Sequence, residues 1–184
     1  MKSGARVLGI AASDADRTST VAGAVVRRDR AVDGVTLGAM CVGGRDATAS
    51  VQSVIDRADR PDVAAVVIAG IAPAWFNLID LHALDAPGPV ISVSFEASSG
   101  LETAIEREFE GAAREWRLAL YRRQPDRHAV AVDGETVYVR SVDASIDRAR
   151  EIVRATTPEG GRPEPVRVAR LIARAASEWR SEDS

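Results

Sequence analysis

The feature that most constrains the fold is an apolar stretch near the middle of the chain. Residues 62–69 (DVAAVVIA) carry almost no polar side chains, which is typical of a strand covered on both faces of a sheet. A turn and a predicted short helix at residues 76–84 follow it. In α/β folds, ligands bind in loops at the carboxyl ends of such strands. We therefore expect a binding site beside Ala69 and Gly70, although neither residue brings a charge.

The elements predicted on either side of this strand define the architecture. Three strands with short links come first and predict an antiparallel meander, at residues 6–12, 18–28 and 32–42. A regular alternation follows, with helix 47–58, strand 62–69, helix 76–84 and strand 89–95. Three antiparallel strands followed by α-β-α-β is the order of a ribonuclease H-like core. The predicted fold class is thus α/β, a ribonuclease H-like mixed sheet.

The rest of the chain adds a hairpin and C-terminal helices to this core. Residues 101–122 are predicted to be helical with a break near Gly111. Asp133-Gly134 is a strong turn signal and predicts a hairpin of strands 128–132 and 136–142. Asp143 is the predicted cap of a helix that ends at Ala155. The last predicted helix spans residues 165–180, and its predicted buried stripe consists of positions 168, 171, 172, 175 and 179.

Composition limits the class of protein. The 184 residues fit one domain (1–184), with a frayed tail at residues 181–184. The net charge of −3 argues against a strongly basic nucleic-acid-binding protein. The single cysteine, Cys41, excludes an intrachain disulfide, and its apolar surroundings predict a core position. No segment is apolar enough to span a membrane, so we expect a soluble cytoplasmic protein without a membrane partner.

Several segments resemble an archaeal family described as endonuclease dU-like, which is similar in fold to endonuclease V. The most specific segment is ATTPEGGRPEPVRVARLIA (residues 155–173), because no simple periodicity explains its run of residues. AGIAPAWFNLIDL (69–81) and GGRDAT (43–48) match two further blocks. The resemblance covers nearly the whole chain. It implies a metal-dependent nuclease in which Mg²⁺, held by carboxylates at adjacent strand ends, activates water at a phosphodiester.

The chain departs from the family pattern where that chemistry would sit. The family's first strand typically ends Gly-Ile-Asp-Asp, whereas this chain has Ala11 and Ala12 after Gly-Ile. The fourth strand typically ends Asp-Gly, and here Ala69 replaces the Asp. A histidine of the last helix is replaced by Arg170, which keeps a positive charge but cannot move protons at neutral pH. These departures predict weak or absent metal-dependent cleavage.

Other residues match the pattern or lie close enough to replace what is missing. The predicted catalytic residues are Asp46, Asp14 and Glu164, and Asp14 and Asp46 are the predicted ligands of Mg²⁺ if the chain is active. The predicted binding residues are Trp75, Asn77, Asp80, Arg167 and Arg170. Asp16 is an alternative to Asp14.

Each of these residues also has a structural interpretation. Asp46 fits an N-cap as well as a metal ligand, and Asn77 fits a helix cap as well as contact with a base. Trp75 is the better candidate for base stacking, because Phe76 is expected in the core. Arg167 and Arg170 fit phosphate contacts or a solvated helix face.

Three functional hypotheses follow. The first is an endonuclease dU-like hydrolase of DNA repair that cuts near a deaminated base, with weak or no activity in this chain. The second is a non-catalytic module that binds nucleic acid or a nucleotide at the same place. The third is a subunit of an assembly that uses the predicted hairpin and the last helix as its interface, with Trp179 and the stripe of Val168 and Leu171 as candidate contacts. The oligomeric state, and the choice between DNA and RNA, stay open at this point.

Overall fold

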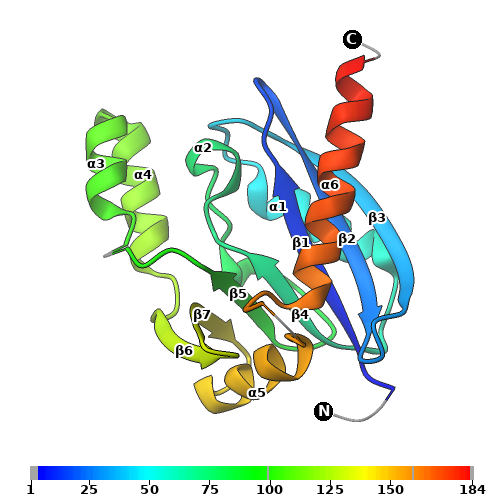
Figure 1. Cartoon of the computed structure of the whole chain (residues 1–184). Helices are drawn as coiled ribbons and strands as arrows, with labels where there is room; N and C mark the ends of the chain where they lie inside the picture. The colour runs from blue at the N-terminus through cyan, green and yellow to red at the C-terminus, as the bar shows by residue number, and fades with distance from the viewer. Residues whose placement is uncertain (1–3, 99, 159, 183–184) are drawn as a thin grey trace.

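The computed structural model describes residues 4–98, 100–158 and 160–182. Strands in these ranges are β1 (Arg6–Ser13), β2 (Thr18–Arg27), β3 (Val32–Cys41), β4 (Val63–Ala69), β5 (Val90–Ser94), β6 (His128–Val132) and β7 (Glu135–Val142). They form one mixed sheet in the order β3-β2-β1-β4-β5-β7-β6 (Figure 1). The meander β1-β2-β3 is antiparallel, whereas β1, β4 and β5 are parallel neighbours. The predicted mixed sheet with an added hairpin is therefore confirmed.

Helices cover both faces of this sheet. The helical elements are α1 (Ala47–Ala58), α2 (Pro73–Phe76), the 3₁₀ turn η1 (Leu81–Ala83), α3 (Glu102–Glu108), α4 (Gly111–Arg122), α5 (Ile146–Thr156) and α6 (Glu164–Glu182). α1 lies on one face, and α5 and α6 lie on the other, while α3 and α4 form a separate helical pair beside α2 (Figure 1). None of the helices in the described ranges combines the length and apolarity that a membrane crossing requires.

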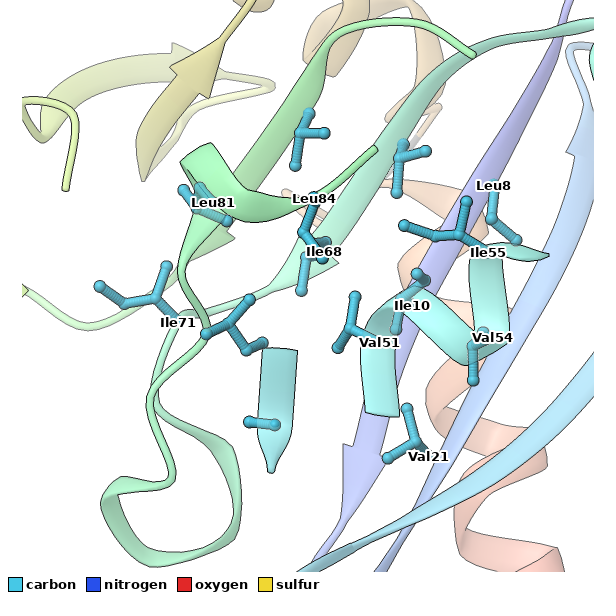
Figure 2. Packing of buried hydrophobic residues seen from close by; sticks show 14 of the residues in the cluster. Leu8, Ile10, Val21, Val51, Val54, Ile55, Ile68, Ile71, Leu81 and Leu84 are labelled. Carbon is cyan, nitrogen blue, oxygen red and sulfur yellow. The ribbon is translucent and has the colours of Figure 1, made fainter. Parts of the chain in front are cut away.

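The central strands are apolar because both of their faces are buried. Leu8, Ile10 and Ile68 pack with Val54 of α1 on one side (Figure 2). Val7, on the alternate face of β1, packs in a second cluster with residues of β4, β5, α5 and α6. Side chains alternate between the two faces of a strand. When both faces are covered, side chains on both are buried, and they are therefore apolar.

The last helix packs mainly through small residues, and the predicted stripe is only partly correct. The buried residues of α6 are Pro165, Val166, Ala169 and Ala173. Val168 and Ile172 of the stripe are partly buried against the sheet, whereas Leu171 and Trp179 are 52% and 65% exposed. The sheet beneath α6 presents Gly9, Ala11 and Ala24, so the helix approaches closely there.

The direction of α6 fixes which of its residues lie near the predicted site. Its first turn packs on Gly9, where an added Cβ would lie 2.1 Å from the carbonyl carbon of Pro165. Near its other end, Arg180 donates to the hydroxyl of Thr20, which pairs with Ser13 at the end of β1. α6 therefore runs from the first half of β1 toward the edge where β1 ends (Figure 1).

Other local predictions are corrected by the structure. The predicted helix 76–84 is absent, and this segment is an extended connection that ends in η1. Ser145, rather than Asp143, caps α5 and accepts a hydrogen bond from the amide of Arg148 at 3.3 Å. Cys41 is exposed at the end of the edge strand β3.

The remaining local predictions fare better. The break near Gly111, which has φ +53°, is confirmed. The tail predicted to fray is partly helical, because Ser181 and Glu182 belong to α6, while residues 183–184 lie outside the described residues.

Gly9→Ala tests the close approach of α6 to β1. The new methyl group would overlap the backbone of Pro165, so we expect a loss of roughly 2 kcal/mol or more in the free energy of unfolding, measured by urea denaturation. Gly34→Ala is the matched control, because its Cβ would meet nothing closer than 3.8 Å. Equal effects of the two substitutions would contradict this packing.

Candidate functional site

The edge of the sheet where β1 and β4 end is lined by methyl groups. Ala11 is 2% exposed and packs in a cluster that contains Ala169 of α6 and borders Ala69 and Ile172. β1 and β4 pair in parallel at Ile10 and Ile68, so the alanines that follow are neighbours. Ala12 packs against the cluster on the opposite face. The positions where the family pattern has acids are thus part of the apolar packing.

A buried amide joins three segments close to this edge. Asn77 is fully buried, and its Oδ1 accepts a hydrogen bond from the amide of Ala47 at 2.9 Å. Its Nδ2 donates to the carbonyl of Cys41 at 2.8 Å and to Oδ1 of Asp46 at 2.6 Å. Asn77 therefore caps a helix as the sequence suggested, but the helix is α1, which is 30 residues away. With both ends of its amide engaged, Asn77 cannot also read a base.

Asp46 occupies the N-cap position of α1 without capping it through its side chain. Its carboxylate accepts hydrogen bonds from the Cys41 amide, at 3.1 and 3.2 Å, and from Asn77. Burial alone would raise the pKa of Asp46, but these hydrogen bonds outweigh burial and hold the pKa below its ordinary value. The carboxylate is therefore charged at neutral pH and already accepts hydrogen bonds from two N–H groups, those of Cys41 and Asn77.

A left-handed turn follows β4 and presents an aromatic ring to solvent. Ala74, Trp75 and Phe76 have φ of 49°, 54° and 56°, a conformation that costs roughly 1–2 kcal/mol for each such residue. Asp14 accepts a hydrogen bond from the Ala74 amide at 3.1 Å, and the Ala74 carbonyl accepts one from Gly43 at 2.7 Å. Trp75 is 53% exposed. The surrounding loops thus hold a strained turn that displays one tryptophan.

Asp80 stabilises the segment after this turn. Its carboxylate pairs with Arg123 and accepts a hydrogen bond from Gln124 at 3.4 Å. Its backbone amide donates to the hydroxyl of Thr48 at 2.9 Å. Asp80 is 7% exposed and joins α1 to the end of α4, so its contacts are those of a structural residue.

The predicted residues from the last helix do not join the others. Glu164 begins α6 beside the first half of β1, away from the edge where Asp14 and Asp46 lie. Its carboxylate forms a two-bond ion pair with Arg167, at 2.6 and 2.7 Å, which lowers the pKa of Glu164. Arg170 is exposed on the outer surface of α6.

The carboxylates near the ends of β1 and β4 are not arranged to bind a magnesium ion. Within the described ranges, no three His, Cys, Asp or Glu side chains gather in a way that could hold a metal. Asp14 accepts hydrogen bonds from Ser19 and Ala74, Asp46 is engaged as described above, and Asp16 is exposed in the β1–β2 hairpin. Mg²⁺ prefers near-octahedral oxygen coordination, and its usual protein ligands include one or two carboxylates. Asp14 and Asp46 accept hydrogen bonds from N–H and O–H groups instead.

Sequence reasoning missed one residue of this region, Arg117. It is 3% exposed and donates to the carbonyls of Phe76 at 3.1 Å and Gly43 at 2.7 Å. α4 contains several arginines, and nothing in their spacing distinguishes the one that turns inward. Arg117 joins α4 to both loops that border the strand ends.

The chain is similar to proteins of known structure over nearly its whole length. The fold is ribonuclease H-like and similar to that of human ENDOV, an endonuclease V, with a TM-score of 0.61 at 13% identity over 98% of this chain and 87% of the other. A protein of unknown function from Archaeoglobus fulgidus superposes with a TM-score of 0.82 at 26% identity, covering 94% and 98% of the two chains.

Sequence similarity is equally extensive. A "UPF0215 protein" of Pyrobaculum calidifontis is 33% identical over 178 residues, which are 92% of this chain and 94% of that protein. Residues 3–177 match the Endonuclease dU family, and the chain belongs to this family.

Asn77→Asp tests the buried amide. The substitution places a second carboxylate against Asp46 and removes two hydrogen-bond donations, so we expect a loss of about 3 kcal/mol in the free energy of unfolding at pH 7. Repulsion raises the pKa of this carboxylate pair in the folded variant. The variant should therefore regain stability relative to wild type as the pH falls from 7 toward about 5, measured by urea denaturation.

Gln52→Glu is the control for Asn77→Asp. Gln52 also donates to a carboxylate, that of Asp56 at 2.7 Å, but at the surface of α1. Gln52→Glu should therefore lower the free energy of unfolding by less than about 1 kcal/mol. A loss as large as that of Asn77→Asp would show that burial of the Asn77 amide is not decisive.

The exposed thiol of Cys41 reports the charge of Asp46. Hydrogen bonding to the Asp46 carboxylate, together with its negative charge, raises the pKa of Cys41. Alkylation by iodoacetamide should therefore have its pH midpoint above that of the urea-unfolded chain, followed by mass spectrometry. Asp46→Asn should lower the midpoint. A wild-type midpoint equal to that of the unfolded chain would contradict the contact.

Proposed function

We propose that this member of the Endonuclease dU family binds nucleic acid at the edge where β1 and β4 end, and cleaves it weakly or not at all. The single observation that carries the proposal is the packing of Ala11 and Ala69 beneath α6, where the family pattern has acids. Without carboxylates at these two positions, the ends of β1 and β4 lack the groups that would hold a cation beside a scissile phosphate. The family description and the fold favour a nucleic acid as the ligand.

A second candidate is an active endonuclease with replacement ligands. It is favoured by the hydrogen bond from Ala74 to Asp14, which brings the β1–β2 hairpin against the loop after β4. In this alternative, Asp14 or Asp16 would act with Asp46. This alternative requires Asp46 to lose its hydrogen bonds with Cys41 and Asn77, so the active endonuclease is the less favoured candidate.

A nicking and binding assay separates the two candidates. Purified protein is incubated with labelled strands that contain deoxyuridine or deoxyinosine, with Mg²⁺, Mn²⁺ or a chelator. We expect salt-sensitive binding that does not depend on the metal, and no nicking above background. Metal-dependent nicking at a single site that disappears in Asp14→Asn and Asp46→Asn would instead establish the active enzyme.

Restoring the acids gives a complementary test. Ala11→Asp combined with Ala69→Asp places two carboxylates on neighbouring parallel strands, where burial makes their charges costly in the absence of a cation. The double variant should melt below wild type, and Mn²⁺ should raise its melting temperature, because a ligand bound only by the native state stabilises it. The wild type should not respond. The same response in wild type would contradict the proposal.

A further inference from the structure

Aromatic side chains, which are scarce in this sequence, gather beside the turn that presents Trp75. The sequence has only three Trp, three Phe and two Tyr, and half of these eight side chains meet here. Trp75 and Phe76 contact edge to face at a centroid distance of 5.7 Å, and Phe76 and Phe109 do so at 5.6 Å. Trp116 of α4 packs against the same small core. We call the following set the arginine–aromatic cluster: Trp75, Phe76, Phe109, Trp116, Arg45 and Arg117.

The two arginines of this cluster have no acidic partner among the described residues. Arg117 is buried, stacks on the ring of Phe109 at 3.8 Å and bonds only to carbonyl oxygens. Arg45 is exposed, and its guanidinium lies over Trp116 at 4.9 Å. Other arginines of the chain do pair with a carboxylate, as Arg123 pairs with Asp80.

The two cations also act on one another. Burial lowers the pKa of Arg117, and the charge of Arg45 lowers it further. Neither guanidinium contacts a carboxylate in the described part of the chain, so an anion could bind Arg45 without displacing an ion pair. An anionic ligand would relieve this repulsion at Arg45, the arginine that solvent reaches.

We propose that the arginine–aromatic cluster binds a single-stranded segment of nucleic acid, with an unpaired base on Trp75 and a backbone phosphate on Arg45. This inference rests on the proposed function and specifies its ligand. The loop that carries Arg45 lies against Trp75, because an added Cβ on Gly43, two residues before Arg45, would lie 3.3 Å from Cδ1 of Trp75. A base inside a duplex cannot offer its face to Trp75, and base–aromatic stacking is characteristic of single-strand binding.

Arg117 is a positioning residue in this arrangement. It holds the Phe76 carbonyl of the left-handed turn and the Gly43 carbonyl of the loop that carries Arg45. The guanidinium of Arg117 thus sets the position of the Trp75 ring relative to Arg45. A lysine would keep the charge but has no planar fork with which to reach both carbonyls.

The main experiment uses tryptophan emission and salt dependence. In a Trp116→Phe, Trp179→Phe background, Trp75 is the only tryptophan, and a thymidine homopolymer of about 12 nucleotides is the probe. We expect binding to quench the emission, and the matching duplex to bind more weakly. Arg45→Gln should weaken binding several-fold and reduce the slope of log K against log salt by about 0.7. Arg148→Gln removes an exposed charge on α5 and is the matched control, with less than about a twofold effect expected.

The outcomes separate this inference from the proposed function. Binding with unchanged Trp75 emission, or with equal effects of Arg45→Gln and Arg148→Gln, would overturn the cluster as the binding surface and leave the proposed function standing. Absence of binding to any strand at low salt would overturn both. Self-association that Arg45→Gln abolishes, without strand binding, would assign the cluster to a protein interface instead.

Two further variants distinguish binding from folding. Trp75→Gly removes the ring at a position with φ 54°, which glycine adopts without strain, so stability should hold or rise while affinity falls roughly tenfold or more. Arg117→Lys should weaken strand binding and increase acrylamide quenching of Trp75 in the same background. Unchanged affinity in Trp75→Gly would overturn the stacking role, and unchanged quenching and affinity in Arg117→Lys would overturn the positioning role.

Discussion

The candidate site depends on one buried amide. Asn77 receives the first N–H of α1, holds the carbonyl at the end of β3 and donates to Asp46. A buried polar group is stable only when its hydrogen-bonding capacity is used, and here the three segments supply those partners to one another. The helix, the edge strand and the loop after β4 are consequently held as one unit, and the left-handed turn just before Asn77 is held with them.

This arrangement separates two groups of residues that the family pattern lists together. Asp46, Asn77 and Asp80 match the pattern, and in this chain each is engaged in contacts between segments. The positions that would carry metal chemistry, Ala11 and Ala69, are instead part of the packing under α6. The chain thus has the contacts that hold this edge together, with alanines at the two positions where the resemblance predicts acids. Such a protein retains a surface for a ligand without the donor set of a hydrolytic centre, which is the basis of the proposed function.

The sequence predicts the strands well because their signal is local. Apolar runs such as residues 62–69 and the Asp133-Gly134 turn, with φ of 50° and 80°, need no distant partner. The prediction of a helix at 76–84 is wrong because the backbone conformation there is set by contacts of Asn77 with α1 and of Asp80 with Arg123. These partners are remote in sequence. In α6, volume decides which face is buried. Small residues fit against the sheet and Trp179 does not, a preference that hydrophobic periodicity cannot register.

Among the site residues too, the sequence predicts local features but not the contacts between distant segments. The sequence presents Asp46 and Asn77 as separate candidates, because their mutual contact spans 31 positions and has no sequence signature. Arg117 has no sequence signal either, because burial of one arginine among several on a helix depends on what packs above it. The absence of acids at positions 11 and 69 was visible from the resemblance, whereas their enclosure by Ala169 required the fold.

Paramagnetic resonance of Mn²⁺ can test whether a divalent cation binds where β1 and β4 end. Free Mn²⁺ gives a six-line signal that disappears on binding, so titration of the protein into Mn²⁺ counts occupied sites. We expect the signal to stay at its free-ion amplitude through one protein equivalent. Stoichiometric loss of the signal in wild type, restored by Asp46→Asn, would contradict the absence of a cation site at these strand ends.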